Sequence, residues 1–128
     1  MKTVKYFTPE EARRTLPLVK RILRDIINAG DTMRKRAQTI QGNVIEDPEI
    51  QNIAGAINDY MSELEEIGCY YKDWNFTIGL VDFPSIIHGQ DVMLCWRSDE
   101  EDIKYYHEMD TGYNGRKLIP DEYFLHKI

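Results

Sequence analysis

The feature that most constrains this chain is a long helical pattern over residues 8–41. Apolar or small residues recur there in alternating steps of four and three, at Ala12, Leu16, Val19, Leu23, Ile26, Gly30, Met33, Ala37 and Ile40. This spacing is the seam of a coiled coil. Thr8 and Glu11 suit a capping box, and Pro9 suits the first helical position. Pro17 removes a backbone donor inside the pattern, so we expect a kink or a break there.

A second helical pattern predicts that the first half of the chain is a helical hairpin. Asp47 and Pro48 are start signals, and Gly68 suits the end of a helix. The apolar residues between them again alternate in steps of three and four: Ile50, Ile53, Ile57, Tyr60, Leu64 and Ile67. The short connection over residues 42–47 makes the two helices antiparallel.

Both helices are apolar over more than this seam. The residues that widen the stripes are Ile22, Ile27 and Ala29 in the first helix and Ala54, Ala56 and Met61 in the second. Such wide stripes are typical of a helix with two neighbours. Either the C-terminal half of the chain or a second copy covers the spare face. We favour a homodimer built as a four-helix bundle.

After Gly68 the composition becomes aromatic and β-branched, which predicts a small antiparallel sheet. The expected strands are residues 77–83, ended by Pro84, then 92–97 and 103–107, with a short leading strand at 2–7. A turn is expected at residues 88–91. The fold class is therefore α+β in a single domain of residues 1–128, with a helical hairpin at 8–67 and a small β-rich region at 68–128.

The hydrophobic pattern also predicts how the last two main strands pair. Pairing Arg97 with Asp102 gives the arginine an acidic partner and lines up one apolar face. The pairs in this register are Trp96 with Ile103, Leu94 with Tyr105, and Val92 with His107.

Charge is distributed unevenly along the 128 residues, whose net charge is −6. Residues 1–45 carry ten Lys or Arg against four Asp or Glu, whereas the remainder carries six against eighteen. We expect the basic first helix to lie against acidic residues of its own fold, because the summed negative field repels phosphate. Nucleic-acid binding through this helix is the least favoured function.

The composition also indicates a compartment. Cys69 and Cys95 match no CxxC or zinc-ligand spacing, which is typical of reduced thiols in the cytoplasm. No stretch approaches the ~20 apolar residues that span a bilayer, and the first residues lack the apolar run of a signal peptide. We expect a cytoplasmic protein with no membrane partner.

Motifs over most of the chain carry a family resemblance. They are Gly79-Leu-Val-Asp-Phe-Pro84, Leu94-Cys-Trp-Arg97, Glu100, His107, Gly112-Tyr-Asn-Gly-Arg116, and an opening Phe7-Thr-Pro-Glu-Glu-Ala12 with Leu16-Pro17. With them the chain resembles an uncharacterised bacterial family known as domain of unknown function 2203. The resemblance implies a small bacterial cytoplasmic protein with a helical hairpin and a β region, and it implies no activity.

A metal site is one hypothesis for the β region, because imidazole and carboxylate ligands suit divalent ions. The candidate ligands are His107, Asp82, Glu108 and Asp110, with His88 as a further imidazole. In a strand, His107 and Glu108 point to opposite faces and cannot both bind one ion directly. His107 with Asp82 or Asp110 stays compatible with a site. The alternative is a partly buried histidine that is hydrogen-bonded to a carboxylate.

An anion or small-molecule site is a second hypothesis. The candidate ligand-binding residues are Asp82, Trp96, Arg97, Glu100, Tyr113 and Arg116. Gly112 and Gly115 would let the backbone approach a ligand closely. The alternative is that Arg116 pairs with an acid. The aromatic set Tyr70, Tyr71, Trp74, Phe76, Trp96, Tyr105, Tyr106 and Tyr113 either lines a pocket or interface or, as we favour, fills the sheet core, with Tyr106 and Tyr113 pointing outward.

No nucleophile elbow, P-loop or dinucleotide fingerprint occurs in the sequence. We therefore predict a non-enzymatic, self-associating protein whose β region presents a surface to a protein or small-molecule partner. The alternative is a metal-binding protein or metal-dependent hydrolase centred on His107, in which a divalent ion would lower the pKa of a bound water.

Overall fold

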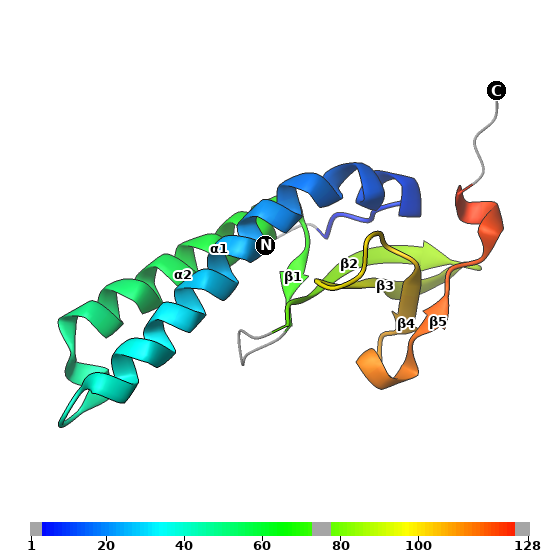
Figure 1. Cartoon of the computed structure of the whole chain (residues 1–128). Coiled ribbons are helices and arrows are strands. Elements are labelled where there is room, and N and C mark those ends of the chain that lie inside the picture. The colour runs from blue at the N-terminus through cyan, green and yellow to red at the C-terminus, as the bar shows by residue number, and fades with distance from the viewer. Residues whose placement is uncertain (1–3, 73–77, 125–128) are drawn as a thin grey trace.

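A helical hairpin leads into a five-stranded antiparallel sheet in the computed structural model, which describes residues 4–72 and 78–124 (Figure 1). The helices are α1 (Pro9–Thr39) and α2 (Pro48–Ile67), and the strands are β1 (Tyr70–Tyr71), β2 (Leu80–Ile87), β3 (Gln90–Arg97), β4 (Tyr105–Glu108) and β5 (Lys117–Leu118). Short 3₁₀ helices cover Val44–Glu46, Tyr113–Gly115 and Asp121–Phe124. The predicted α+β class is confirmed. Trp74, Phe76 and Thr77 lie outside the described residues.

The helix boundaries follow from local capping chemistry. The Thr8 hydroxyl accepts a hydrogen bond from the Glu11 amide at 3.1 Å, and the Glu11 carboxylate accepts one from the Thr8 amide at 2.9 Å. Asp47 caps α2, and Gly68 ends it with φ 113°. The break predicted at Pro17 is wrong, since α1 is continuous. Pro17 itself is exposed, and buried neighbours on either side hold the helix together.

Strand order in the sheet is β1-β2-β3-β4-β5, so every strand pairs with its neighbour in the chain. A two-residue turn joins β2 to β3, with φ 51° at His88 and 75° at Gly89, as in a type I′ hairpin. The predicted strand end at Pro84 is wrong, because Pro84 lies inside β2. The Pro84 carbonyl accepts a hydrogen bond from the Phe7 amide at 2.7 Å, on the side of β2 that faces away from β3. The N–H that proline lacks would point to the same side, so its absence costs no hydrogen bond to β3.

Two further strand predictions are wrong. Residues 4–8 form no strand, because Pro84 opposite them has no amide to add a second rung. The register of β3 and β4 differs from the predicted one by a single residue: Cys95 pairs with Tyr105, Leu94 with Tyr106, and Met93 with His107. The predicted Arg97–Asp102 contact is absent from the described residues. Asp102 instead lies 3.3 Å from Arg13, and Arg97 lies 2.5 Å from Asp99.

The core lies between the helices and one face of the sheet. Its sheet residues include Val81, Phe83, Ile87, Val92, Leu94 and Trp96, and its helix residues include Leu16, Val19, Leu23, Ile26 and Leu64. The one-residue shift turns Tyr106 toward this core, so its predicted outward position is wrong, whereas Tyr113 is exposed as predicted. Within the described residues, no helix is both long and apolar enough to cross a membrane.

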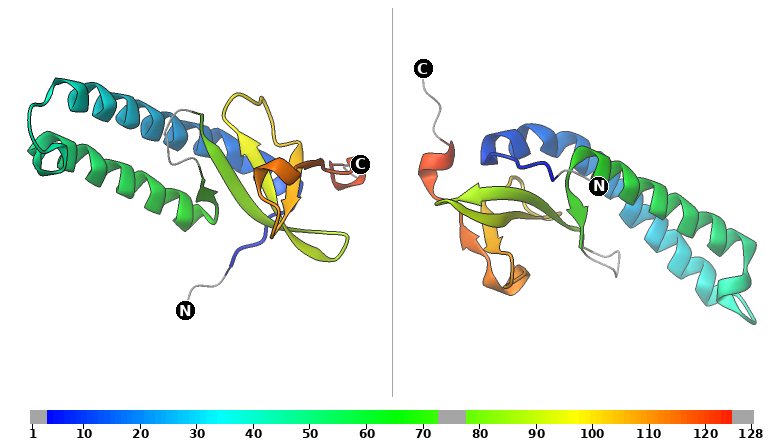
Figure 2. Two further views of the ribbon diagram at one scale, coloured as in Figure 1. Left: turned by 90° about the horizontal axis from the view of Figure 1, so that it is seen from below. Right: turned by 180° about the vertical axis from the view of Figure 1, so that it is seen from behind.

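The first half of α1 lies against the sheet, and the other end of the hairpin extends beyond it (Figures 1 and 2). Arg13 donates to the Ile103 carbonyl at 3.2 Å, and Lys20 donates to the Glu101 carbonyl at 2.8 Å. The basic residues of this half of α1 thus meet the acidic β3–β4 loop. The C-terminal half of the chain covers one face of α1 here, as one of the two expected arrangements requires.

Candidate functional site

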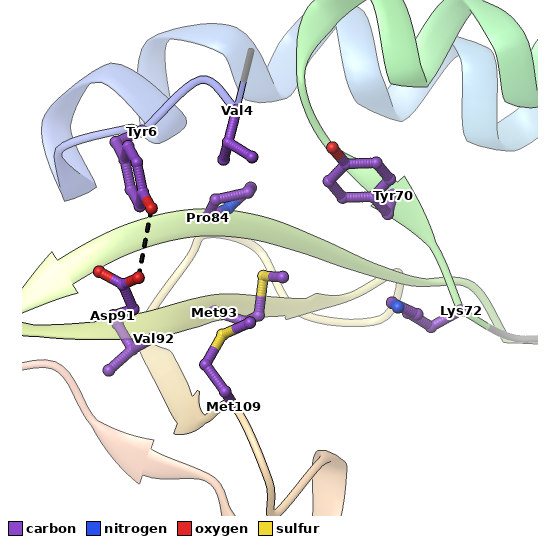
Figure 3. A pocket seen from close by; sticks show the side chains of 9 residues that line it. All are labelled: Val4, Tyr6, Tyr70, Lys72, Pro84, Asp91, Val92, Met93 and Met109. Carbon is purple, nitrogen blue, oxygen red and sulfur yellow. Dashed lines mark hydrogen bonds between the residues drawn. The ribbon is translucent and has the colours of Figure 1, made fainter. Parts of the chain in front are cut away.

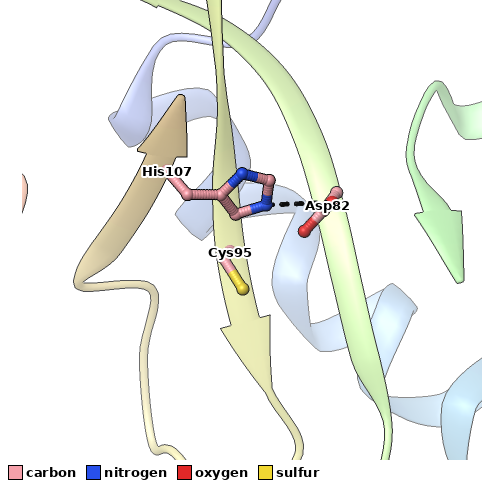
Figure 4. A group of neighbouring side chains, drawn as sticks. All are labelled: Asp82, Cys95 and His107. Carbon is pink, nitrogen blue, oxygen red and sulfur yellow. Dashed lines mark hydrogen bonds and ion pairs between the residues drawn. The ribbon is translucent and has the colours of Figure 1, made fainter. Parts of the chain in front are cut away.

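Three buried polar side chains gather on the outer face of the sheet, away from the helices (Figure 4). Asp82 in β2, Cys95 in β3 and His107 in β4 alternate along their strands with core residues such as Val81, Leu94 and Tyr106. Asp82 and Cys95 are directly opposite each other. All three residues are no more than 5% exposed. The three side chains therefore form a buried polar cluster on the face of the sheet that the helices do not cover.

Hydrogen bonds to Glu108 and Asp82 fix the orientation of the His107 ring. Nδ1 lies 2.8 Å from the backbone carbonyl oxygen of Glu108. Since a carbonyl only accepts, Nδ1 carries the hydrogen and donates it. Nε2 then faces the Asp82 carboxyl at 3.2 Å. One candidate ligand atom from each of Asp82, Cys95 and His107 lies within 4.8 Å of the other two.

The electrostatics of the cluster disfavour negative charge. Burial raises the pKa of the Asp82 carboxyl, against the opposing effects of His107 and Lys72. Burial, reinforced by Asp82, raises the pKa of the Cys95 thiol to about 12. Cys95 is therefore a protonated thiol at neutral pH and a poor nucleophile as it stands. A bound cation would favour the charged forms of both groups.

A cavity of about 390 Å³ opens onto the cluster. Its other lining residues are Lys72, Leu80, Met93, Met109, Gly112 and Tyr113. Gly112 has φ 66°, a conformation that glycine adopts without strain, at the turn that leads to Tyr113. The cluster can therefore meet a water molecule or a small ligand from this side.

The other predicted metal ligands lie elsewhere. Glu108 is on the opposite face of β4, as its position next to His107 requires, and pairs with Lys117 at 3.3 Å. Asp110 is exposed beyond the end of the strand. His88 lies in the β2–β3 turn, 3.7 Å from Glu122. Of the predicted set, the structure brings together only His107 and Asp82.

The predicted anion-binding residues form a second, self-paired group. Arg116 and Glu100 make an ion pair whose side chains are 11% and 15% exposed. The Arg116 guanidinium lies 4.0 Å from the centre of the Tyr105 ring, which orients it further. Arg97 pairs with Asp99 and donates to the Tyr113 hydroxyl. The charge of each arginine is thus balanced by an acid, as the alternative interpretation expected of Arg116.

Trp96 lies apart from this group on the core face of the sheet, with only its Nε1 reaching the Glu100 carbonyl at 2.9 Å. Cys95 and Lys72 were missed by sequence reasoning. A signal for Cys95 was present: a two-residue turn at His88-Gly89 sets a register in which Cys95 faces Asp82. For Lys72 the sequence holds no comparable signal, because its place depends on how β1 docks beside β2.

Comparison with known proteins identifies a family. No curated protein and no solved structure matches the chain significantly. The model of an uncharacterized conserved family, DUF2203, matches residues 5–119, a range that includes both helices and all five strands of the described structure. The chain therefore belongs to the DUF2203 family of uncharacterized conserved proteins.

Proposed function

We propose that this protein is a cytoplasmic metal-binding protein that holds a divalent ion between Asp82, Cys95 and His107 and uses it for hydrolysis. The observation that carries the proposal is the convergence of three different ligand types, all buried, with their ligand atoms within 4.8 Å of one another. Buried polar groups of this kind are costly unless they are hydrogen-bonded or bind an ion.

The donor set indicates which ion the cluster suits. Imidazole nitrogen, thiolate sulfur and carboxylate oxygen together favour Zn²⁺ over harder ions such as Mg²⁺. Ligand atoms around a tetrahedral zinc lie roughly 3.3–3.8 Å apart, so modest side-chain adjustment would close the cluster around an ion. The hydrogen bond from Nδ1 of His107 to the Glu108 carbonyl leaves Nε2 for the ion, an outer-shell contact that ligating histidines usually make.

The adjacent cavity supports a catalytic type of site. Three protein ligands with a fourth position open to water are typical of catalytic zinc, whereas structural zinc has four protein ligands. The bound ion would lower the pKa of its water toward neutrality and supply the nucleophile. In the protein itself, Cys95 would hold negative charge only once the ion replaced its proton.

Metal analysis tests this proposal. Untagged protein, purified without chelator, is expected to carry one zinc or to take up one Co²⁺ with thiolate charge-transfer absorption. Cys95→Ser should remove that absorption, and His107→Gln should weaken binding at least about tenfold. His88→Gln removes an exposed histidine and is the matched control. Sub-stoichiometric metal, or equal loss in His88→Gln, overturns the proposal, provided that circular dichroism shows each variant folded.

A second candidate function, self-association through the hairpin, rests on how charge is divided between the helices. α1 carries eight Lys or Arg and four Asp or Glu, whereas α2 carries five Asp or Glu and no Lys or Arg. Two copies related by a twofold axis can place α1 of each against α2 of the other. The end of the hairpin that extends beyond the sheet offers room for this contact (Figure 2).

Charge reversal tests self-association. Arg21→Glu/Arg24→Glu on α1 and Asp59→Lys/Glu63→Lys on α2 alter side chains that are exposed in the chain by itself. Each double variant is expected to be monomeric by sedimentation, while an equimolar mixture restores a dimer because both contacts again join opposite charges. Lys104→Glu, in the β3–β4 loop, is the control. A wild-type protein that stays monomeric at 50 mM salt contradicts the idea.

A further inference from the structure

We propose that the outer face of the sheet binds an amphipathic monocarboxylate, with its anionic head at Lys72 and its apolar tail along Met93 and Met109. The site is a second cavity of about 450 Å³ (Figure 3), which shares Lys72, Met93 and Met109 with the cavity above the buried cluster. As a binding site it goes beyond the proposed hydrolysis, and it would name the substrate class if that function holds.

Most of the residues that line this cavity are apolar or aromatic. Its apolar residues include Val4, Tyr6, Tyr70, Pro84, Met93 and Met109. Val4 is 48% exposed, Tyr6 45% and Met109 58%, so several of the large exposed apolar side chains of the described chain gather on this one surface. Apolar surface gathered in a concavity is typical of a binding site.

Methionine suits a pocket that accepts tails of different length. Met93 and Met109 lie side by side, with their thioethers between β3 and the chain that follows β4 (Figure 3). Their unbranched side chains rotate freely and adapt to the shape of an apolar ligand. The same two residues and Lys72 also line the cavity above Asp82, Cys95 and His107. The two cavities are therefore adjacent, and together we call them the cleft: its apolar end is the cavity of Figure 3, and its polar end is the cavity above the cluster.

Lys72 gives the cleft its charge preference. It is exposed and lines both cavities. Its charge opposes the rise in the Asp82 pKa, but within residues 4–72 and 78–124 its ammonium forms no hydrogen bond or ion pair. Asp91, the acid of the apolar end, already accepts from the Tyr6 hydroxyl at 3.2 Å. A single anionic head therefore fits at Lys72, and the far end, beside Asp91, favours an uncharged tail.

Titration with straight-chain carboxylates tests the inference. Metal-free protein with ¹³C-methyl methionine is titrated with butyrate through decanoate, and the methyl shifts of Met93 and Met109 are followed by NMR. Affinity is expected to rise about fourfold per added methylene until the tail fills the cavity. Primary alcohols of equal length should bind more weakly, because they lack the charge that Lys72 attracts.

Variants separate the two ends of the ligand. Lys72→Gln should weaken every carboxylate by the same factor, up to about fivefold, and leave the alcohols unchanged. Met93→Ser/Met109→Ser lacks both methyl probes, so its binding is measured by isothermal titration calorimetry, and it should flatten the dependence on chain length. Lys104→Gln, an exposed lysine elsewhere, is the matched control. A flat chain-length series, or an equal effect of Lys104→Gln, overturns the proposal.

Two further outcomes distinguish carboxylate binding from the metal proposal and from self-association. Because the titration uses metal-free protein, it measures carboxylate binding without the proposed ion. Failure of the metal proposal therefore leaves carboxylate binding intact, and failure of carboxylate binding leaves the metal proposal intact. If Met93→Ser/Met109→Ser instead abolishes self-association and no carboxylate shifts the methyl signals, the surface is an interface between copies and the inference is wrong.

Discussion

At the scale of single residues, the two cysteines share a protonation state but differ in surroundings. Cys69 follows the Gly68 cap of α2, with its sulfur 3.6 Å from the Leu64 carbonyl oxygen, whereas Cys95 lies beside Asp82 and His107 on the outer sheet face. Burial raises the pKa of each thiol to about 12. Only Cys95 therefore has neighbours with which it could share an ion, and Cys69 behaves as a small core residue.

The reactivity of Cys69 checks this account. In a Cys95→Ser variant at pH 8, a pKa of about 12 leaves about one thiolate in ten thousand, against roughly a quarter for a free thiol. Disulfide exchange with an aromatic disulfide should therefore be at least about a thousandfold slower than for the unfolded chain, and should speed up as pH rises. A native rate close to that of the variant in urea would contradict the burial of Cys69.

At the scale of elements, Gly79, just before β2, lies close against the Leu23 side chain of α1. A Cβ atom at this position would lie 2.4 Å from the Leu23 side chain, which is 1% exposed. Leu23 is held in the core and has little freedom to move. Glycine is therefore needed here for the contact between α1 and the start of β2.

Alanine substitutions at two glycines test this packing. Gly79→Ala is expected to lower the free energy of unfolding by about 1–3 kcal/mol, because it overfills the contact with Leu23. Gly55→Ala, within α2 and with no atom within 4 Å of the added methyl, should raise it by about 0.5–1 kcal/mol through helix propensity. Urea denaturation measures both changes. Equal effects of the two substitutions would show that helix–sheet packing is not the cause.

The elements divide into those that local chemistry specifies and those that it does not. The helix bounds at Thr8, Asp47 and Gly68 could be predicted because a cap involves only neighbouring residues. The β3–β4 register could not, because the partner of Asp102 is Arg13, far away in the sequence. That one-residue shift decides which side chains share a face with His107, so the site was only partly predictable.

At the scale of the whole molecule, the two ends of the hairpin differ in how much they pack against the rest of the fold. The first half of α1 lies against the sheet and its β3–β4 loop, whereas the far end of the hairpin extends beyond the sheet (Figure 1). Gly30 is the last buried residue of α1, and Ile45 in the connection is 78% exposed. Fewer buried contacts at the far end should lower the free energy needed to open it locally.

Hydrogen exchange tests this difference and, with it, the second candidate function. At low protein concentration, amides of residues 33–39 and 50–56 should exchange faster than those of residues 19–26, because only the latter have the sheet beside them. A second copy that packs along the hairpin would protect the far end, so this difference should shrink as concentration rises. Protection that is uniform along the hairpin at every concentration would contradict unequal support. If the far end exchanges faster by the same factor at every concentration, no second copy packs along the hairpin.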